Sequence, residues 1–236
     1  MSEQSAAASY IFPPLPVPVL PIVGRDEFFP VHRIYCLGQN YADHVRELGG
    51  DPSKQAPPAF FQKAADCIAV SGATFPYPPS STEVHYEIEL VVALGQGGTN
   101  VTREEARGLI YGYAAGFDMT CRDLQNEAKK SGRSWEAAKS FEMSAPCSAI
   151  MPASDIGHPE AARIWLDVNG ELRQNGNIDQ MIWKSEEIIA YLSRFFTLRA
   201  GDLILTGTPA GVGPVTRGDH IRGGVEGVGE LEIYVV

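Results

Sequence analysis

The stretch HYEIELVVAL, residues 85–94, places two glutamates in a run of mostly apolar residues. Val, Ile and Leu in a run of this length are typical of a strand. Side chains of a strand point alternately to its two faces, so Glu87 and Glu89 are expected to project side by side from one face. Two carboxylates near the core repel each other, and a hard divalent cation would relieve that repulsion. A solvated acidic face on an edge strand is the alternative interpretation.

Other short runs rich in Val, Ile, Leu and Tyr predict further strands, at residues 32–37, 59–62, 163–168, 202–205 and 230–235. Helices are predicted at residues 102–112, 120–130 and 185–196, the first opening with a Thr102–Glu105 capping box. Strands and helices do not alternate regularly, and no G-x-G-x-x-G follows the first strand, which argues against a doubly wound nucleotide-binding sheet. The sequence therefore predicts an α+β fold, a mixed and mostly β domain with peripheral helices.

The composition predicts one domain behind a short arm. Of the 236 residues 44% are hydrophobic and 20% charged, which suits a globular chain with one substantial core. The segment YIFPPLPVPVLP, residues 10–21, holds five prolines, which prevent a helix and favour extended chain. We therefore predict a Pro-rich arm over residues 1–27, lying on another surface, and a catalytic domain over residues 28–236.

The net charge and the lengths of the apolar runs argue against two classes of partner, nucleic acids and membranes. A formal net charge of −10 argues against nucleic acid, whose binding depends on neutralising phosphates with Lys and Arg. No run approaches the roughly 20 apolar residues of a membrane-spanning helix, and the first residues lack the features of a secretory signal. The four cysteines lie far apart, as expected of buried free thiols. We expect a cytoplasmic protein with no membrane partner.

Three further segments carry candidate functional residues. In GFDMTCRDLQ, residues 116–125, Asp118 is either a helix cap or a third metal-binding carboxylate. In NYADHVREL, residues 40–48, His44 and Glu47 lie three residues apart, as neighbours on a helical turn. A carboxylate beside an imidazole suits a general base, and an exposed salt bridge is the alternative. In AKSFEMSAP, residues 138–146, Lys139 is a candidate cation that would bind an anionic substrate, and a surface lysine is the alternative.

The loop TGTPAGVGP, residues 206–214, follows a predicted strand and brings backbone N–H groups and Thr hydroxyls close to a ligand. It lacks the GK[ST] ending of a P-loop, which excludes a nucleoside triphosphate. Taken in order, GQNYADH, FFQK, HYEIEL, FDMTCRDLQ, AKSF, VNGELRQ and TGTPAGVG resemble the fumarylacetoacetate hydrolase family. The resemblance runs from about residue 28 to residue 236, and is strongest to the small single-domain branch of acylpyruvate hydrolases and oxaloacetate decarboxylases.

The resemblance implies a fold, a metal and roles for particular residues. The fold is a mixed β roll, usually in a homodimer, and the cofactor is Mg²⁺ or Mn²⁺. The implied metal ligands are Glu87, Glu89 and Asp118; the implied catalytic residues are His44 and Glu47, a water-activating dyad on a lid segment, and Lys139; the implied substrate contacts are Lys63, Arg122, Gln125 and Thr208. Two positions depart from the branch: Gln39 stands where its members usually have the arginine of a GRNY motif, and Ala64 follows Lys63 where they often have a proline.

The implied activity is metal-dependent hydrolysis of the C–C bond of an acylpyruvate, a small anionic 2-oxo acid. The phrases FFPVHRIYC and FFQK favour fumarylpyruvate, cleaved to fumarate and pyruvate in aromatic (gentisate) degradation. Oxaloacetate decarboxylation, or action on another acylpyruvate, is the alternative within enzymes. An idle, metal-stabilised binding module is the alternative of a different class, and the pairing of three carboxylates with a dyad and a lysine argues against it.

Overall fold

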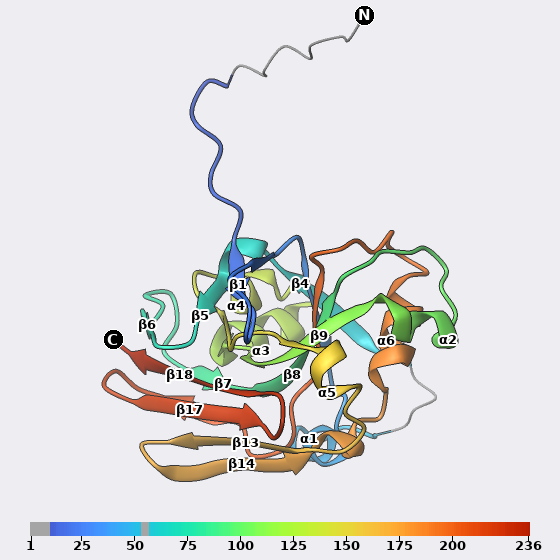
Figure 1. Ribbon diagram of the computed structural model, residues 1–236. Helices are drawn as coiled ribbons and strands as arrows, with labels where there is room; N and C mark the ends of the chain where they lie inside the picture. The colour runs from blue at the N-terminus through green and yellow to red at the C-terminus, as the bar shows by residue number, and fades with distance from the viewer. Residues whose placement is uncertain (1–9, 53–56) are drawn as a thin grey trace, which may run out of the picture.

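The described part of the chain, residues 10–52 and 57–236 of the computed structural model, is built on four sheets (Figure 1). The largest sheet is mixed and has the strand order β4–β3–β15–β8–β9–β11–β5, with β12 paired to β9. Its strands are β4 (Ala59–Lys63), β3 (Ile34–Gly38), β15 (Leu203–Leu205), β8 (Ile88–Leu94), β9 (Ile110–Phe117), β11 (Ala145–Cys147), β5 (Ile68–Val70) and β12 (Met151–Pro152). It confirms the expected fold class.

Three smaller sheets complete the roll. One has the order β14–β13–β17–β18–β6, the second β10–β7–β16, and the third pairs β1 with β2. Their strands are β14 (Glu171–Asn177), β13 (Arg163–Val168), β17 (His220–Val225), β18 (Gly229–Val235), β6 (Ala73–Phe75), β10 (Thr120–Cys121), β7 (Val84–Tyr86), β16 (Gly213–Val215), β1 (Val19–Pro21) and β2 (Phe28–Pro30). Every strand predicted from the sequence therefore has a counterpart here.

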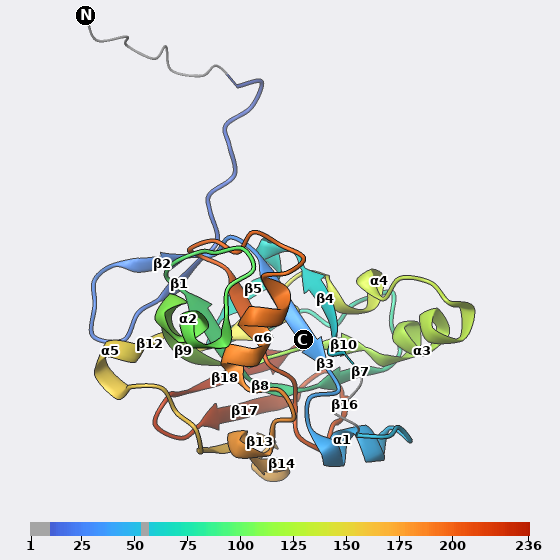
Figure 2. The ribbon, with the colours of Figure 1, turned by 90° about the vertical axis from the view of Figure 1, so that its right-hand side faces the viewer.

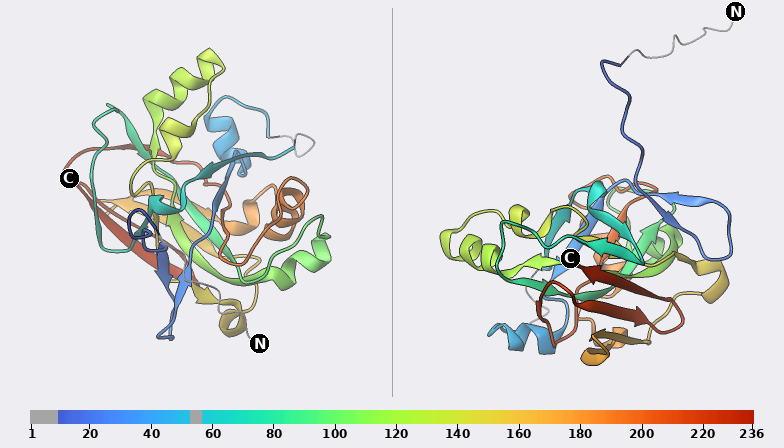
Figure 3. Two further views of the ribbon diagram at one scale, coloured as in Figure 1. Left: turned by 90° about the horizontal axis from the view of Figure 1, so that it is seen from above. Right: turned by 90° about the vertical axis from the view of Figure 1, so that its left-hand side faces the viewer.

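Short helices lie at the periphery of the sheets, as predicted, with α3 beside α4 and α2 beside α6 (Figures 2 and 3). The α-helices are α1 (Ala42–Glu47), α2 (Arg103–Ala106), α3 (Arg122–Ser131), α4 (Glu136–Lys139), α5 (Ala153–Ile156) and α6 (Ser185–Leu192), and the 3₁₀ turns are η1 (Ala65–Cys67), η2 (Arg107–Leu109) and η3 (Ile178–Gln180). Among the described residues, no helix combines the length and apolar character needed to span a bilayer.

The predicted helices are longer than the observed ones. The Thr102–Glu105 capping box opens α2 as expected, but the helix ends at Ala106 because the chain from Ile110 pairs with β8 instead. Likewise residues 120–121 join β7 as strand β10, so α3 begins only at Arg122. Pairing between distant segments overrides local helix propensity at both places.

Strand β8 forms the centre of the fold and is buried along its whole length. Its alternate residues face two different hydrophobic clusters: Leu90 and Val92 pack in one, Val91 and Ala93 in the other. Glu89 shares the face of the second pair. A strand buried on both faces explains why this stretch shows no alternation of apolar and polar residues.

The chain is interrupted between β7 and β8 and again between β9 and β10, and the two interruptions lie side by side. The predicted strand 86–94 is interrupted at Glu87, whose carbonyl accepts from the Asp118 N–H at 2.8 Å across the break between β9 and β10. The Ile88 N–H donates to Gln174 Oε1 at 3.0 Å instead of to a neighbouring strand. The continuous strand predicted from the sequence is wrong at this residue, because a side chain takes the place of a strand partner.

The Pro-rich segment contributes β1, in which Leu20 is buried against the body of the protein. From residue 10 to the start of β1 the chain is extended and leads away from the body (Figures 1 and 3). Residues 1–9 of the predicted arm lie outside the described residues, and the boundary at residue 27 stays a prediction.

Candidate active site

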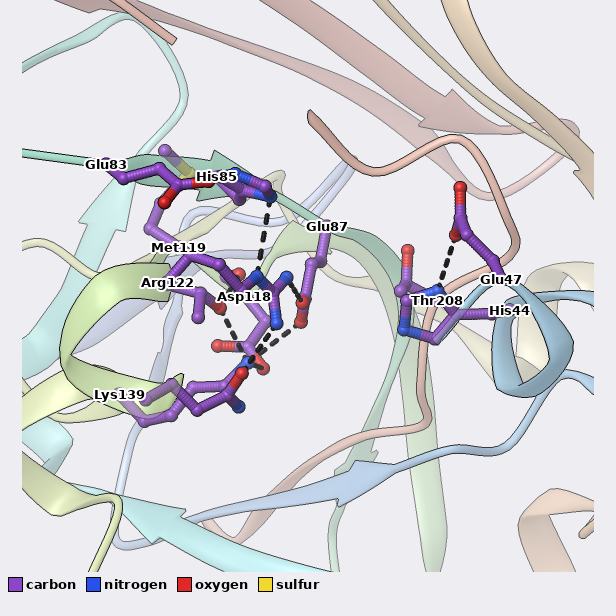
Figure 4. Close-up of polar contacts among 12 residues, drawn as sticks. His44, Glu47, Glu83, His85, Glu87, Asp118, Met119, Arg122, Lys139 and Thr208 are labelled. Atoms are coloured by element: carbon purple, nitrogen blue, oxygen red, sulfur yellow. Dashed lines mark hydrogen bonds and ion pairs between the residues drawn. The ribbon is translucent and has the colours of Figure 1, made fainter. Parts of the chain in front are cut away.

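Three acidic side chains converge where the strand pairs break. Glu87, Glu89 and Asp118 are buried, and one carboxylate oxygen from each lies within 4.8 Å of those of the other two. The break at Glu87 and Asp118 lets both side chains turn toward the same interior space, which Figure 4 shows between β8 and α3. We call these three residues the carboxylate triad.

Three cations surround two members of the triad. Lys139 on α4 donates to Glu87 Oε2 at 2.8 Å and to Asp118 Oδ2 at 2.6 Å (Figure 4). Lys63 Nζ lies 2.9 Å from Asp118 Oδ1, and Arg122 pairs with Glu87. Burial alone would raise the pKa of Glu87, but Lys139 and Arg122 hold that pKa well below its ordinary value. Glu87 is therefore a carboxylate at neutral pH.

Glu89, in contrast, has no cation partner within ion-pair distance among the described residues. Its carboxylate accepts from the backbone N–H of Gly207 at 2.7 Å. Burial first, and then the charges of Asp118 and Glu87, raise the pKa of Glu89 well above its ordinary value. A divalent cation bound by all three oxygens would favour the ionised form. Oxygen-only ligands suit Mg²⁺ or Mn²⁺, so the triad fits the predicted cofactor.

Metal binding should be visible as a gain in stability. At a free Mn²⁺ concentration about 100 times the Kd, binding to the folded state adds about 2.7 kcal/mol to the free energy of unfolding. For a chain of this size we expect the melting temperature to rise by roughly 5 to 10 °C. Differential scanning fluorimetry with Mn²⁺, Mg²⁺ and a chelator measures the shift, and an unchanged melting temperature at saturating metal would count against the site.

The predicted dyad forms on α1. His44 Nδ1 lies 2.9 Å from Glu47 Oε2, and the other oxygen of Glu47 accepts from the Gly211 N–H at 3.1 Å. His44 is buried and lies beside Thr208, across from the cluster of Glu87, Asp118, Arg122 and Lys139 (Figure 4). Because Glu47 holds Nδ1, the other ring nitrogen is left to exchange a proton with a ligand.

Gln174 connects the Gly-rich loop, residues 206–214, with the start of β8 next to Glu87. Its side chain donates to Thr208 Oγ1 and to the Pro209 carbonyl, each at 2.8 Å, while its oxygen accepts from Ile88. Thr208 Oγ1 accepts here, so its own hydrogen is left to donate elsewhere. Gln174 closes the motif VNGELRQ, which the sequence offered without indicating a role for this residue.

Most predicted site residues line one pocket. His44, Arg122, Gln125, Lys139, Thr208 and the triad all line it, together with Gln39. Lys63 is the exception among the predicted substrate contacts, since it lies fully buried behind Asp118. The pocket also has Phe61, Lys129 and Trp135 in its wall, which the sequence analysis missed. Lys129 follows Arg122 and Gln125 at helical spacing, a usable signal, whereas nothing local marked Trp135.

The pocket is small. Its volume of about 30 Å³ leaves room for no more than a few water molecules. A substrate with several carbon atoms needs an opening. The segment carrying His44 is tied to the Gly-rich loop at two points: Glu47 accepts from the Gly211 N–H, and Asn40 donates to the Thr206 carbonyl at 2.7 Å. Flanking glycines, Gly38 and Gly49, permit hinge motion at its two ends.

We therefore expect residues 40–50 to exchange amide hydrogens faster in the free protein than in the presence of metal and a small 2-oxo acid. Hydrogen exchange followed by mass spectrometry measures this, with β8 as the internal reference because it is buried along its whole length. Equal protection of residues 40–50 in both states would contradict a moving lid.

Known proteins resemble this chain in sequence and in fold. The profile of the fumarylacetoacetate (FAA) hydrolase C-terminal family matches residues 33–236. A fumarylpyruvate hydrolase of Ralstonia sp is 47% identical over 189 residues, covering 80% of this chain and 98% of the relative. The mitochondrial oxaloacetate tautomerase of Mus musculus is 44% identical over 202 residues, covering 86% and 90%. The crystal structure of fumarylpyruvate hydrolase from Pseudomonas aeruginosa in complex with Mn²⁺ and pyruvate superposes with a TM-score of 0.94, at 49% identity over 97% of this chain and 99% of the other.

Proposed function

The chain belongs to the fumarylacetoacetate hydrolase family, and on that basis we propose that it hydrolyses the C3–C4 bond of an acylpyruvate, with fumarylpyruvate first. This proposal starts from three premises. The chain belongs to this family, it is an enzyme that acts on oxo acids, and its triad binds a divalent metal. The observation that carries the hydrolytic assignment is the His44–Glu47 pair, held at 2.9 Å and facing the triad across the pocket. Such a pair is what a reaction that consumes water needs.

The carboxylate triad would hold the cation, which when bound polarises the 2-oxo carbonyl of the substrate. We assign Lys139, whose ammonium donates to Glu87, Asp118 and Thr120, the role of stabilising the negative charge that develops on the substrate. Arg122 and Gln125, joined by a 2.6 Å hydrogen bond, orient the substrate from α3. We assign Thr208 the role of binding the substrate carboxylate, since its hydroxyl hydrogen is left to donate. We assign Lys63 the role of balancing the negative charge of Asp118.

In the proposed step His44 takes a proton from a water molecule whose oxygen forms a bond to C4. The C3–C4 bond then breaks and its electron pair stays with the pyruvate fragment. That fragment takes up a proton at C3 and leaves as pyruvate, while C4 leaves as a carboxylic acid, fumarate for a fumaryl group. Glu47 holds the ring of His44 and stabilises its charged form between the two proton transfers.

A second candidate acts on oxaloacetate, and the mouse relative at 44% identity favours it. Oxaloacetate shares the 2-oxo acid group and undergoes either keto–enol exchange, which moves a proton at C3, or decarboxylation. Neither reaction consumes water. The catalytically idle module is the weaker proposal, because it gives no role to the His44–Glu47 dyad or to the buried Lys139.

A panel of substrates tests the proposal. Metal-loaded enzyme is supplied with fumarylpyruvate, maleylpyruvate, acetylpyruvate and oxaloacetate, and the loss of enol absorbance in the ultraviolet is followed with product analysis. We expect the highest kcat/KM on fumarylpyruvate and no reaction after chelation of the metal. Enolisation of oxaloacetate without cleavage of any acylpyruvate would move the assignment to the second candidate.

We also propose that the enzyme is a cytoplasmic homodimer. The oligomer is expected from the family resemblance, and light scattering on the purified protein measures its mass. The compartment is open to a direct test by fractionation, since the mouse relative is mitochondrial.

A further inference from the structure

One cation in the pocket wall has no role in the site described so far. Lys129 lines the pocket but pairs with no carboxylate at ion-pair distance among the described residues. Its Nζ lies instead 5.0 Å from the centre of the Trp135 ring. Arg122, Lys139 and Lys63, in contrast, are each tied to a member of the triad. Lys129 is therefore the pocket-lining lysine left to meet a ligand.

The position of Lys129 follows from helix geometry. Arg122, Gln125 and Lys129 recur at i, i+3 and i+7 along α3, so they share one face of the helix, and all three line the pocket. Arg122 and Gln125 are buried at the inner end, whereas Lys129 is exposed. Burial, and then the positive charges of Arg122 and Lys139, lower the pKa of Lys129, which places its ammonium in a positive field. An anion in that field would be attracted by all three cations.

The wall between the triad and Lys129 is aromatic. The rings of Phe61 and Trp135 lie 6.3 Å apart, and Lys139 Nζ lies 5.1 Å from the centre of the Phe61 ring. The same two rings border an outer hollow of about 570 Å³, which lies next to the pocket. Flat, unsaturated carbon chains pack well against such rings. The path from the triad to Lys129 thus suits a planar acyl chain.

Length selects which acids can use this path. Lys129 lies two helical turns beyond Arg122, a rise of roughly 10 Å along α3. A seven-carbon acid such as fumarylpyruvate has six bonds from end to end, about the span of two extended residues or about 7 Å. The flexible lysine side chain covers the remainder. Oxaloacetate has half as many bonds, about 3.5 Å by the same measure, and is too short to reach both ends.

We infer that Lys129, backed by Trp135, receives the second carboxylate of the substrate, so that the enzyme selects 2,4-dioxo acids whose acyl group itself ends in an acid. This inference rests on the proposed function and names the substrate class within it. Gln39, which lines the same pocket, leaves the wall without the arginine of the related motif. Lys129 therefore supplies the distal positive charge from α3, and it is a specificity-determining residue.

The test compares Lys129→Met with the unmodified enzyme on fumarylpyruvate, acetylpyruvate and oxaloacetate. Loss of a hydrogen bond to a charged group should raise the KM for fumarylpyruvate roughly 10- to 100-fold, with kcat changed little. Acetylpyruvate, which lacks a second carboxylate, and oxaloacetate should change by less than about twofold. Lys129→Arg should restore most of the loss. Lys130→Met, the neighbouring lysine outside the pocket, is the matched control.

A binding measurement separates this inference from the proposed function. Calorimetry with metal-loaded His44→Ala protein compares fumarylpyruvate with acetylpyruvate, with and without Lys129→Met. A preference for fumarylpyruvate that disappears in Lys129→Met supports the inference, even if the unmodified enzyme cleaves neither acid and the proposed function fails. If Lys129→Met weakens the binding of both acids equally, or of neither, the inference is overturned while hydrolysis stands.

Discussion

Replacing Glu89 with Gln is expected to weaken metal binding severely while leaving the fold intact. The amide oxygen of Gln can still accept from the Gly207 N–H, so the local hydrogen bond survives. The charge that a cation needs is lost, and we expect the affinity for Mn²⁺ to fall at least 100-fold, since changes to outer-shell partners alone cost about 10- to 100-fold. Cleavage of acylpyruvates and any reaction of oxaloacetate should fall together, because both require the polarised 2-oxo group.

Titration calorimetry with Mn²⁺ measures the affinity, and the melting temperature without metal measures the fold. That melting temperature should stay the same or rise, because the change removes a buried carboxylate that lies beside two others. Glu87→Gln is a less clean variant, since it also leaves Arg122 and Lys139 without their partner. Glu83→Gln, an exposed acid before β7, is the matched control. Full Mn²⁺ affinity in Glu89→Gln would remove Glu89 from the metal site.

The second large effect is expected from His44→Ala. If the dyad activates water, acylpyruvate cleavage should fall by about 10²-fold or more, the usual contribution of a positioned base. Decarboxylation of oxaloacetate consumes no water and should fall much less. Glu47→Gln should give an intermediate loss, because Glu47 acts through His44 and not on the substrate.

Both activities are measured at full metal occupancy, checked by calorimetry on each variant. Asp43→Asn, on the exposed part of the same helix, controls for damage to α1. If His44→Ala lowers hydrolysis and decarboxylation by the same factor, the dyad does more than activate water, and the ranking of hydrolysis above the oxaloacetate reactions loses its support.

Local sequence patterns located part of the architecture. Apolar runs bounded by turn residues located β3, β4, β8, β13, β15 and β18, and the Thr102–Glu105 box located the start of α2, but the long strands β9, β14 and β17 were not predicted. The ends of helices were missed where a distant strand competed for the same residues, as at Ile110. The break at Glu87 could not be predicted, because it depends on the side chain of Gln174, a residue far along the chain.

The candidate site, too, was predictable from the sequence only in part. Spacing alone suggested that Glu87 and Glu89 act together and that His44 faces Glu47, and the structure brings both pairs together. No local pattern tied Asp118 to the glutamates, and only the order of motifs along the chain did so. Contacts that connect separate segments, such as Trp135 with Lys129, left no trace in sequence spacing.

The paired break at Glu87 and Asp118 also determines which changes of chain length the protein tolerates. Side-chain direction alternates along each strand, so one residue inserted or deleted between 84 and 94 inverts the orientation of everything beyond it. Glu89 would then face the cluster of Leu90 and Val92, and its former place would go to an apolar side chain. Substitutions on the exposed edges of the sheets leave this parity untouched. Insertions and deletions in homologues should therefore be confined to the loops outside β7–β8 and β9–β10.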